Sequence, residues 1–221
     1  MPIDAVPISA LFISGGFIAE VRASPAEREG TRQMATTRDP LRVTLGLRAA
    51  LAGAFAVVVT LSADSLGHVP VDVDAAARAG SIYFGAFEVL QGAVVALGAR
   101  STPSAVGRTL VRARGAVGVL LGALAVLLAG AGFGFLLLIV TVTALLTGVL
   151  EVLVGARRQD AGPASRDAIV AGGLTTLVGV LLLLLPFTVT STLGLLAAWT
   201  ALLAVYLGIA AASLRPARQT A

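Results

Sequence analysis

Two acidic residues, Glu88 and Glu151, stand inside long apolar stretches, and each lies in a similar nonapeptide. The segment that begins at Gly85 reads GAFEVLQGA, and the segment that begins at Gly148 reads GVLEVLVGA. A carboxylate can carry a proton or bind an ion, but an ionised carboxylate at the centre of a bilayer costs on the order of 2.5–3.5 kcal/mol. Each acid therefore needs either a proton or a partner.

Glu88 is the stronger candidate for chemistry, because it lies near the middle of the apolar run 79–99. Gly85 and Gly92 share its helical face, which lets a neighbouring helix approach closely. Gln91 is adjacent and could donate a hydrogen bond to the carboxylate. Two interpretations stay open at this point. One is a proton-responsive or ion-relay carboxyl, and the other is a buried hydrogen bond that fixes helix packing.

Glu151 lies six residues before Arg157, which is about 9 Å along a helix axis. Arg114 or Arg166 from neighbouring helices could also come near it, so we expect a structural ion pair. Small residues flank this acid on one face, as in the first nonapeptide: Gly148 and Gly155.

A second polar group lies in the loop after the first apolar run, where His68 accompanies Asp64, Asp72 and Asp74. Carboxylates and an imidazole could bind a divalent cation or respond to pH. The spacing matches no metal motif, however, and a solvated loop is the simpler interpretation.

Other chemistry finds no support in the sequence. The chain has no Cys, which excludes disulfides and thiolate sites, and a single His cannot form a two-histidine zinc motif. The glycine pairs lack the Lys and the strand context of a phosphate-binding loop. We therefore expect no enzyme, no cofactor and no identifiable small-molecule ligand.

The composition indicates an integral membrane protein. Hydrophobic residues make up 57% of the 221 residues and charged residues only 13%, whereas a soluble domain carries about 25% charged residues. All 16 basic residues are Arg, and nearly all of them flank apolar runs. The net charge of +4 therefore indicates membrane topology rather than nucleic-acid binding.

Six apolar runs are long enough to cross a bilayer, which takes about 17–25 helical residues. They are continuous rather than alternating, so helices are favoured over a barrel. The expected spans are 45–62, 79–99, 115–131, 134–156, 168–185 and 192–214.

The connections between the runs are alternately poor and rich in Arg, so the positive-inside rule places both termini in the cytoplasm. We therefore expect a multi-pass protein of the plasma (inner) membrane. Residues 1–33 read as a flexible extension or a mis-called start, with an amphipathic surface helix as the alternative. Residues 34–221 then form the six-span domain.

The runs form a threefold repeat of tandem helical hairpins. Arg48, Arg114 and Arg166 each open a hairpin and precede a helix rich in small residues. The third hairpin ends with LAVYLGIAA, which puts Tyr206 in the place of the Glu and Ala210 in the place of the second Gly. All three hairpins share one orientation, unlike the inverted repeats of many transporters.

The three short hairpins, the Gly-rich helices that follow a basic residue, the LLLLLPF segment and the Gly–Glu helix resemble the HdeD family, which carries domain of unknown function 308. The resemblance covers residues 40–215, although the chain lacks the Trp that often opens the first helix in that family. It implies a six-span inner-membrane protein linked to acid-stress resistance, without known catalytic residues.

We therefore expect a non-enzymatic stress protein in the lipid bilayer. The alternative is a small proton-linked transporter or channel that uses Glu88. Gly-rich helix faces are also compatible with a homo-oligomer.

Overall fold

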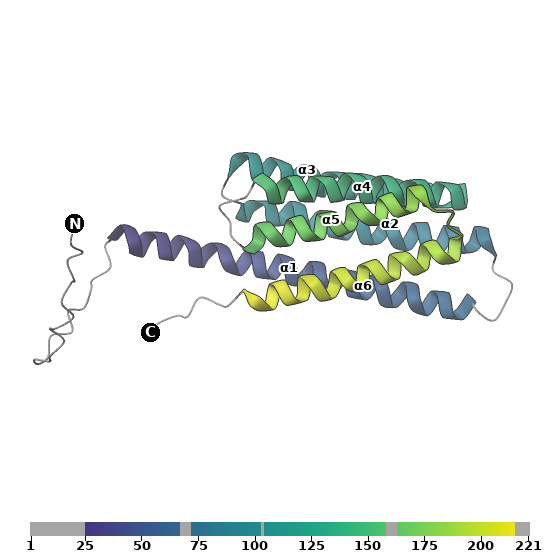
Figure 1. Ribbon diagram of the computed structural model, residues 1–221, viewed down its shortest axis with the longest axis horizontal. Helices are drawn as coiled ribbons and strands as arrows, with labels where there is room; N and C mark the ends of the chain where they lie inside the picture. Colours follow the sequence, from purple (N-terminus) through teal and green to yellow (C-terminus); the bar gives the residue numbers. More distant parts are fainter. Residues whose placement is uncertain (1–24, 67–71, 103, 158–162, 215–221) are drawn as a thin grey trace, which may run out of the picture.

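The computed structural model describes residues 25–66, 72–102, 104–157 and 163–214, and these residues form a bundle of helices (Figure 1). The six long helices are α1 (Pro25–Leu66), α2 (Val73–Gly98), α3 (Ala105–Leu127), α4 (Phe133–Arg157), α5 (Pro163–Leu184) and α6 (Val189–Ser213). Two short 3-10 turns are η1 (Ala99–Ser101) and η2 (Ala129–Ala131). The predicted class, an all-α membrane protein of three tandem hairpins, is confirmed.

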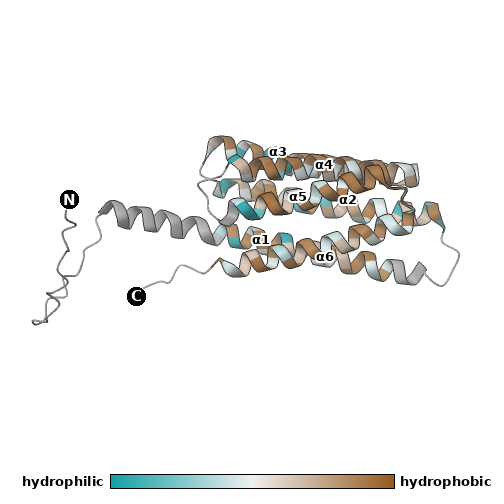
Figure 2. Ribbon diagram, viewed as in Figure 1, coloured by the Kyte–Doolittle hydropathy of each residue, from teal (hydrophilic) through white to brown (hydrophobic). Residues whose placement is uncertain are grey.

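Each helix contains a segment that is long and apolar enough to cross a bilayer. The segments are Pro40–Ser62, Val73–Ser101, Ala105–Leu127, Phe133–Arg157, Ser165–Leu184 and Val189–Ser213. Many large apolar side chains are exposed on these helices. Figure 2 shows hydrophobic residues along most of each helix, with hydrophilic residues mainly toward the helix ends. Such a surface is suited to lipid rather than to water.

The largest difference from the expected spans is at α3, which begins at Ala105 rather than at 115. Ser104 caps this helix, because its side chain accepts a hydrogen bond from the Gly107 amide. The arginines that follow therefore lie within the helix and not in a loop.

At the start of the chain, α1 begins at Pro25, so residues 25–33 continue the first helix rather than the extension. Residues 1–24 lie outside the described part.

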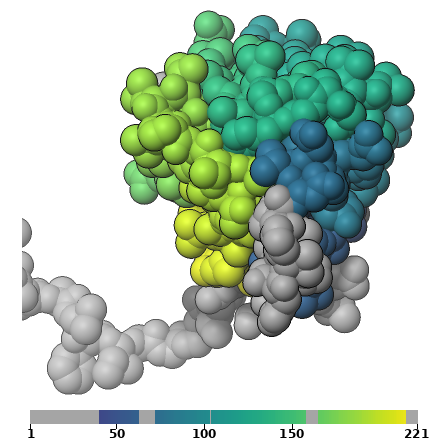
Figure 3. Space-filling view, turned by 90° about the vertical axis from the view of Figure 1, so that its right-hand side faces the viewer, coloured from purple at the N-terminus to yellow at the C-terminus, as the bar shows by residue number. Residues whose placement is uncertain are grey.

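The second helix of each hairpin is more buried than the first. In α2, α4 and α6, 44% of the apolar segment is buried, against 33% in α1, α3 and α5. The most extensive contacts join consecutive hairpins: α2 packs on α3, α4 on α5, and α6 returns to α1. Contacts within a hairpin are fewer, so the bundle consists of three tightly packed pairs in a closed ring. Figure 3 shows the end of this ring where α5 and α6 connect.

Glycines bring the helices of the first two pairs together. A Cβ atom on Gly85 would lie 2.5 Å from the Gly122 carbonyl oxygen, and one on Gly92 would lie 2.5 Å from that of Gly115. Gly148 lies against α5 in the same way, because an added Cβ would come within 2.7 Å of the Thr176 amide nitrogen. Backbones can approach this closely because small residues stand at the points of contact.

The pair of α1 and α6 is less close, because a Cβ on Gly53 would still lie 3.7 Å from the Ala204 methyl group. Larger side chains join it to α2 instead. The rings of Phe55 and Phe87 are 4.6 Å apart, and Trp199 meets Phe87 edge-on at 6.4 Å. Such aromatic pairs contribute about 0.5–1.5 kcal/mol each beyond the burial of their surface.

Two neighbouring glycines of α5 test this packing. A Cβ on Gly172 would lie 2.7 Å from the Gly148 carbonyl oxygen, whereas a Cβ on Gly173 would meet nothing within 4 Å. We expect Gly172→Ala to separate α4 from α5 and to cost about 1–3 kcal/mol, measured as a lower thermal midpoint in detergent. Gly173→Ala is the matched control and should be neutral or stabilising, because Ala favours a helix. Equal effects of the two changes would contradict close packing at this position.

Candidate functional site

A buried ion-pair cluster surrounds Glu151 of α4. Nη2 of Arg48 in α1 lies 2.7 Å from Oε1 of Glu151, and Nη2 of Arg114 in α3 lies 3.5 Å from Oε2. The first contact is an ion pair by its distance. The three side chains are 7–9% exposed, so the two arginines neutralise the carboxylate away from solvent.

Gln91 of α2 extends the cluster by holding Arg48 in place. Its Oε1 accepts a hydrogen bond from Nε of Arg48 at 3.4 Å, and its Nε2 donates to the Arg48 carbonyl oxygen at 3.1 Å. These two bonds fix both the guanidinium and the backbone of the α1 turn from which it extends. Gln91 therefore orients Arg48 toward Glu151 and is not a donor to Glu88.

Glu88 lies one turn from Gln91, deeper in α2, and is buried to 3% exposure. Its Oε2 has no hydrogen-bond partner among the described residues. This oxygen lies 3.3 Å from the position that a Cβ on Gly118 would occupy, so the carboxyl group rests against α3. Arg114 and Arg48 attract the carboxylate, and Glu151 repels it. We use the name polar cluster for these five residues: Arg48, Glu88, Gln91, Arg114 and Glu151.

The polar cluster links all three tight pairs. Glu151 belongs to the α4–α5 pair, Arg48 to the α1–α6 pair, and Arg114 to the α2–α3 pair. A separate bond joins the remaining neighbours, because the Tyr206 hydroxyl of α6 donates to Oδ1 of Asp167 in α5 at 2.9 Å. Each seam between pairs is thus bridged by at least one polar contact.

The polar contacts lie toward one end of the bundle, which we call the Arg-rich end. Here α2 and α4 end and α3 and α5 begin, and it is the left end in Figure 1. Glu151 is six residues from the end of α4, about 9 Å along the axis, and Arg114 is nine residues from the start of α3, about 14 Å. Glu88 is deeper, near the middle of its span. The cluster is therefore inside the apolar zone, where the charges must neutralise one another.

The sequence placed the acids correctly on helices but missed one of their principal partners. Arg114 was among the expected neighbours of Glu151, whereas the other two, Arg157 and Arg166, are exposed. Arg48 makes the shortest contact, and the sequence indicated it only as a residue that opens a hairpin. A signal was present, since Arg48 and Arg114 stand at corresponding places in two repeats and each precedes a helix of small residues.

The other predicted site residues lie apart from the cluster. The predicted helix-packing glycines all lie at the close approaches between α2 and α3 or between α4 and α5: Gly85, Gly92, Gly148 and Gly155.

Asp72 caps α2, where its Oδ1 accepts hydrogen bonds from the amides of Asp74 and Ala75. His68 and the side chain of Asp64 lie outside the described residues. In the described part, no group of three acidic or histidine side chains is placed to hold a metal.

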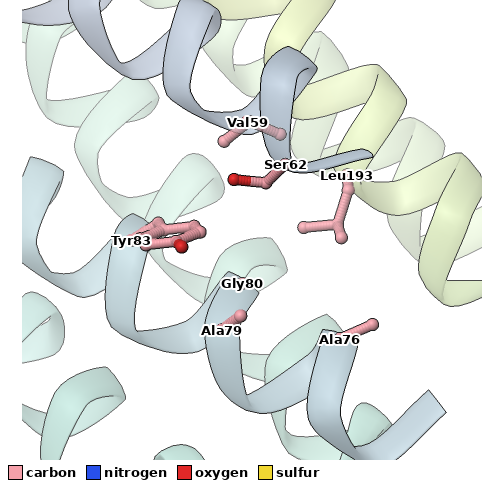
Figure 4. Close-up of a pocket in the computed structure, with 7 residues that line it drawn as sticks. All are labelled: Val59, Ser62, Ala76, Ala79, Gly80, Tyr83 and Leu193. Carbon is pink, nitrogen blue, oxygen red and sulfur yellow. The ribbon is translucent and has the colours of Figure 1, made fainter. Parts of the chain in front are cut away.

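A small cavity lies at the opposite end of the bundle, on the seam between α1, α2 and α6 (Figure 4). Its volume of about 20 Å³ is room for roughly one water molecule. The lining residues are Val59, Ser62, Ala76, Ala79, Gly80, Tyr83 and Leu193. The cavity is too small to receive a solute and lies away from the polar cluster.

No protein-family model, curated protein or solved structure matches this chain.

The arrangement of charges suits Glu151 and Glu88 to different tasks. Glu151 has an arginine on each oxygen, so it is committed to holding helices together. Glu88 has an oxygen without a partner in the described structure, so it can gain or lose a proton without breaking a hydrogen bond of that oxygen.

Replacing each acid by Gln tests this division. Glu151→Gln leaves two buried arginines without their shared anion, which should cost about 3–5 kcal/mol. Glu88→Gln is the matched change, and in an acidic buffer it should cost less than about 1 kcal/mol, because Oε2 of Glu88 has no hydrogen bond to lose in the described structure. Thermal midpoints in detergent would measure both, and an equal loss of stability would contradict the division.

Proposed function

We propose that this chain is a non-enzymatic stress protein of the inner membrane, of the acid-resistance type, whose six-span bundle acts through its packing or its contacts with partners. The observation that carries the proposal is the engagement of Glu151 by Arg48 and Arg114 from two other tight pairs. A carboxylate held in this way joins helices and does not act as a carrier that must release its ion. We call the contacts of Glu151 with Arg48 and Arg114 the clamp.

The resemblance to the HdeD family supports the same proposal. The repeat, the Gly-rich helix faces and the number of spans are the features that suggest the family, and its proteins are linked to survival of acid. The bundle offers a surface for contacts with partners, because many large apolar side chains are exposed on its helices. A second copy of the chain is one partner that this surface would suit.

A proton-linked transporter or channel is the second candidate, and one observation favours it. Glu88 is buried near the middle of its span, and its Oε2 lacks a partner in the described structure. Ionisable groups at such depth are often part of ion or proton pathways. Here the carboxyl would accept a proton from one side of the membrane and release it to the other.

Vesicles that contain the purified chain and a trapped pH-sensitive dye separate the two candidates. For a stress protein without transport we expect proton entry to equal that of protein-free vesicles, for the wild type and for Glu88→Gln alike. Proton entry in the wild type that Glu88→Gln abolishes would contradict the first proposal and support the second. A circular dichroism spectrum of the variant would control for loss of the fold.

The orientation is a further part of the proposal. Exposed arginines at the Arg-rich end favour the cytoplasm by the positive-inside rule: Arg42, Arg100, Arg112, Arg157 and Arg166. We expect a reporter inserted after Ala131, in the turn between α3 and α4, to report the outer side, and one inserted after Ser101 to report the cytoplasm. The reverse pattern would overturn the orientation while leaving the six-span fold intact.

A further inference from the structure

We propose that Arg114 is a shared counter-ion, which binds Glu151 when Glu88 carries a proton and moves toward Glu88 when that proton is lost. The inference rests on the clamp proposed above and adds a means of regulating it.

In the observed arrangement, the guanidinium group of Arg114 uses only part of its capacity to donate hydrogen bonds. Among the described residues, its one contact to an acid is the 3.5 Å contact of Nη2 with Glu151, which is at the long limit of a hydrogen bond. Nε and Nη1 have no hydrogen-bond partner in the described part of the chain, although the residue is 7% exposed. A buried guanidinium with unsatisfied N–H groups gains free energy from any carboxylate that can reach it.

Glu88 offers such a carboxylate. Its Oε2 also lacks a partner among the described residues, and it lies against Gly118. Gly118 is one turn from Arg114 on α3, on the same side of the helix. Because Gly118 has no side chain, nothing on α3 at that turn separates the guanidinium from the carboxyl group.

The charges around Glu88 determine the direction of the exchange. Arg48 faces it from α1, Arg114 from α3 and Glu151 from α4, whereas the sequence of α6 carries no charged residue. Arg100 of η1 is exposed at the Arg-rich end, twelve residues along the chain from Glu88. With Glu88 ionised, two arginines balance two glutamates, and with Glu88 neutral, both arginines are left for Glu151.

The exchange changes the contacts between the tight pairs. The contact of Arg114 with Glu151 crosses the seam between the α2–α3 pair and the α4–α5 pair, whereas a contact with Glu88 stays within the α2–α3 pair. Protonation of Glu88 therefore strengthens this seam, and loss of the proton weakens it. The clamp is expected to be tighter in acid, as a protein that protects against acid would require.

A double-mutant cycle measures the coupling of Arg114 to Glu151 directly. Thermal midpoints of the wild type, Arg114→Gln, Glu151→Gln and the double variant would be recorded in detergent, in an acidic and in a neutral buffer. We expect a larger coupling in the acidic buffer. The side chain at position 88 is always neutral in Glu88→Gln. In this background we expect both buffers to give the coupling between Arg114 and Glu151 that the wild type shows in the acidic buffer.

The outcomes separate the switch from the clamp. An equal coupling in both buffers for the wild type, a larger one at neutral pH, or a pH dependence that persists with Glu88→Gln would overturn the switch alone. A thermal midpoint that Glu151→Gln leaves unchanged would overturn the clamp itself.

A second measurement leaves Arg114 and Glu151 unchanged, so it also serves if an Arg114 variant fails to fold. The chain has no Cys, so Ala116→Cys in α3 and Leu153→Cys in α4 would carry spin labels at exposed positions without background. We expect a shorter and narrower distance distribution in acid than at neutral pH, and the acidic distribution in both buffers with Glu88→Gln. Identical distributions in both buffers for the labelled wild type would overturn the switch.

Discussion

Two buried arginines from different helices share one glutamate, and the arrangement of the whole bundle depends on that contact. In a bilayer, apolar side chains gain little by meeting each other rather than lipid, so apolar packing does not determine which helices are neighbours. Glycine faces bring helices close within the α2–α3 and α4–α5 pairs. Glu151 then joins the pairs to one another, because Arg48 and Arg114 reach its carboxylate from the two other pairs.

Polar contacts occur at similar places in the three hairpins, although Gln91 lies three residues from the repeated Glu position and Asp167 one residue from the repeated Arg position. In every hairpin, a polar residue in the first half of the first apolar segment meets one in the second half of the second apolar segment. Arg48 meets Gln91 in the first hairpin and Arg114 meets Glu151 in the second. The third hairpin keeps the geometry with a different chemistry, because Tyr206 donates to Asp167. The doubled Glu motif is thus a consequence of repetition, and Glu88 and Glu151 have separate roles.

Hydrophobic runs and the alternation of Arg in the connections were enough to predict the helices and their hairpin order. The small faces around Gly85 and Gly148 were also visible in the sequence, because glycines seven residues apart lie on one side of a helix. Their partners were not visible. A small face shows that a helix comes close but not which helix it is, and the closest helix belongs to the next hairpin rather than to the same one. Arg48 was missed for a related reason: an arginine near the start of a span usually extends toward the membrane surface, whereas here Glu151 and Gln91 hold it inside.

The coupling between Arg48 and Glu151 tests the central claim most directly. A double-mutant cycle with Arg48→Gln and Glu151→Gln would measure it, with the free energy of unfolding as the readout in detergent or in a bilayer. If the contact joins the helix pairs, the two changes together should cost less than the sum of the single changes by more than about 1 kcal/mol. Additivity within about 0.5 kcal/mol would show that the two residues act independently, and it would contradict the clamp.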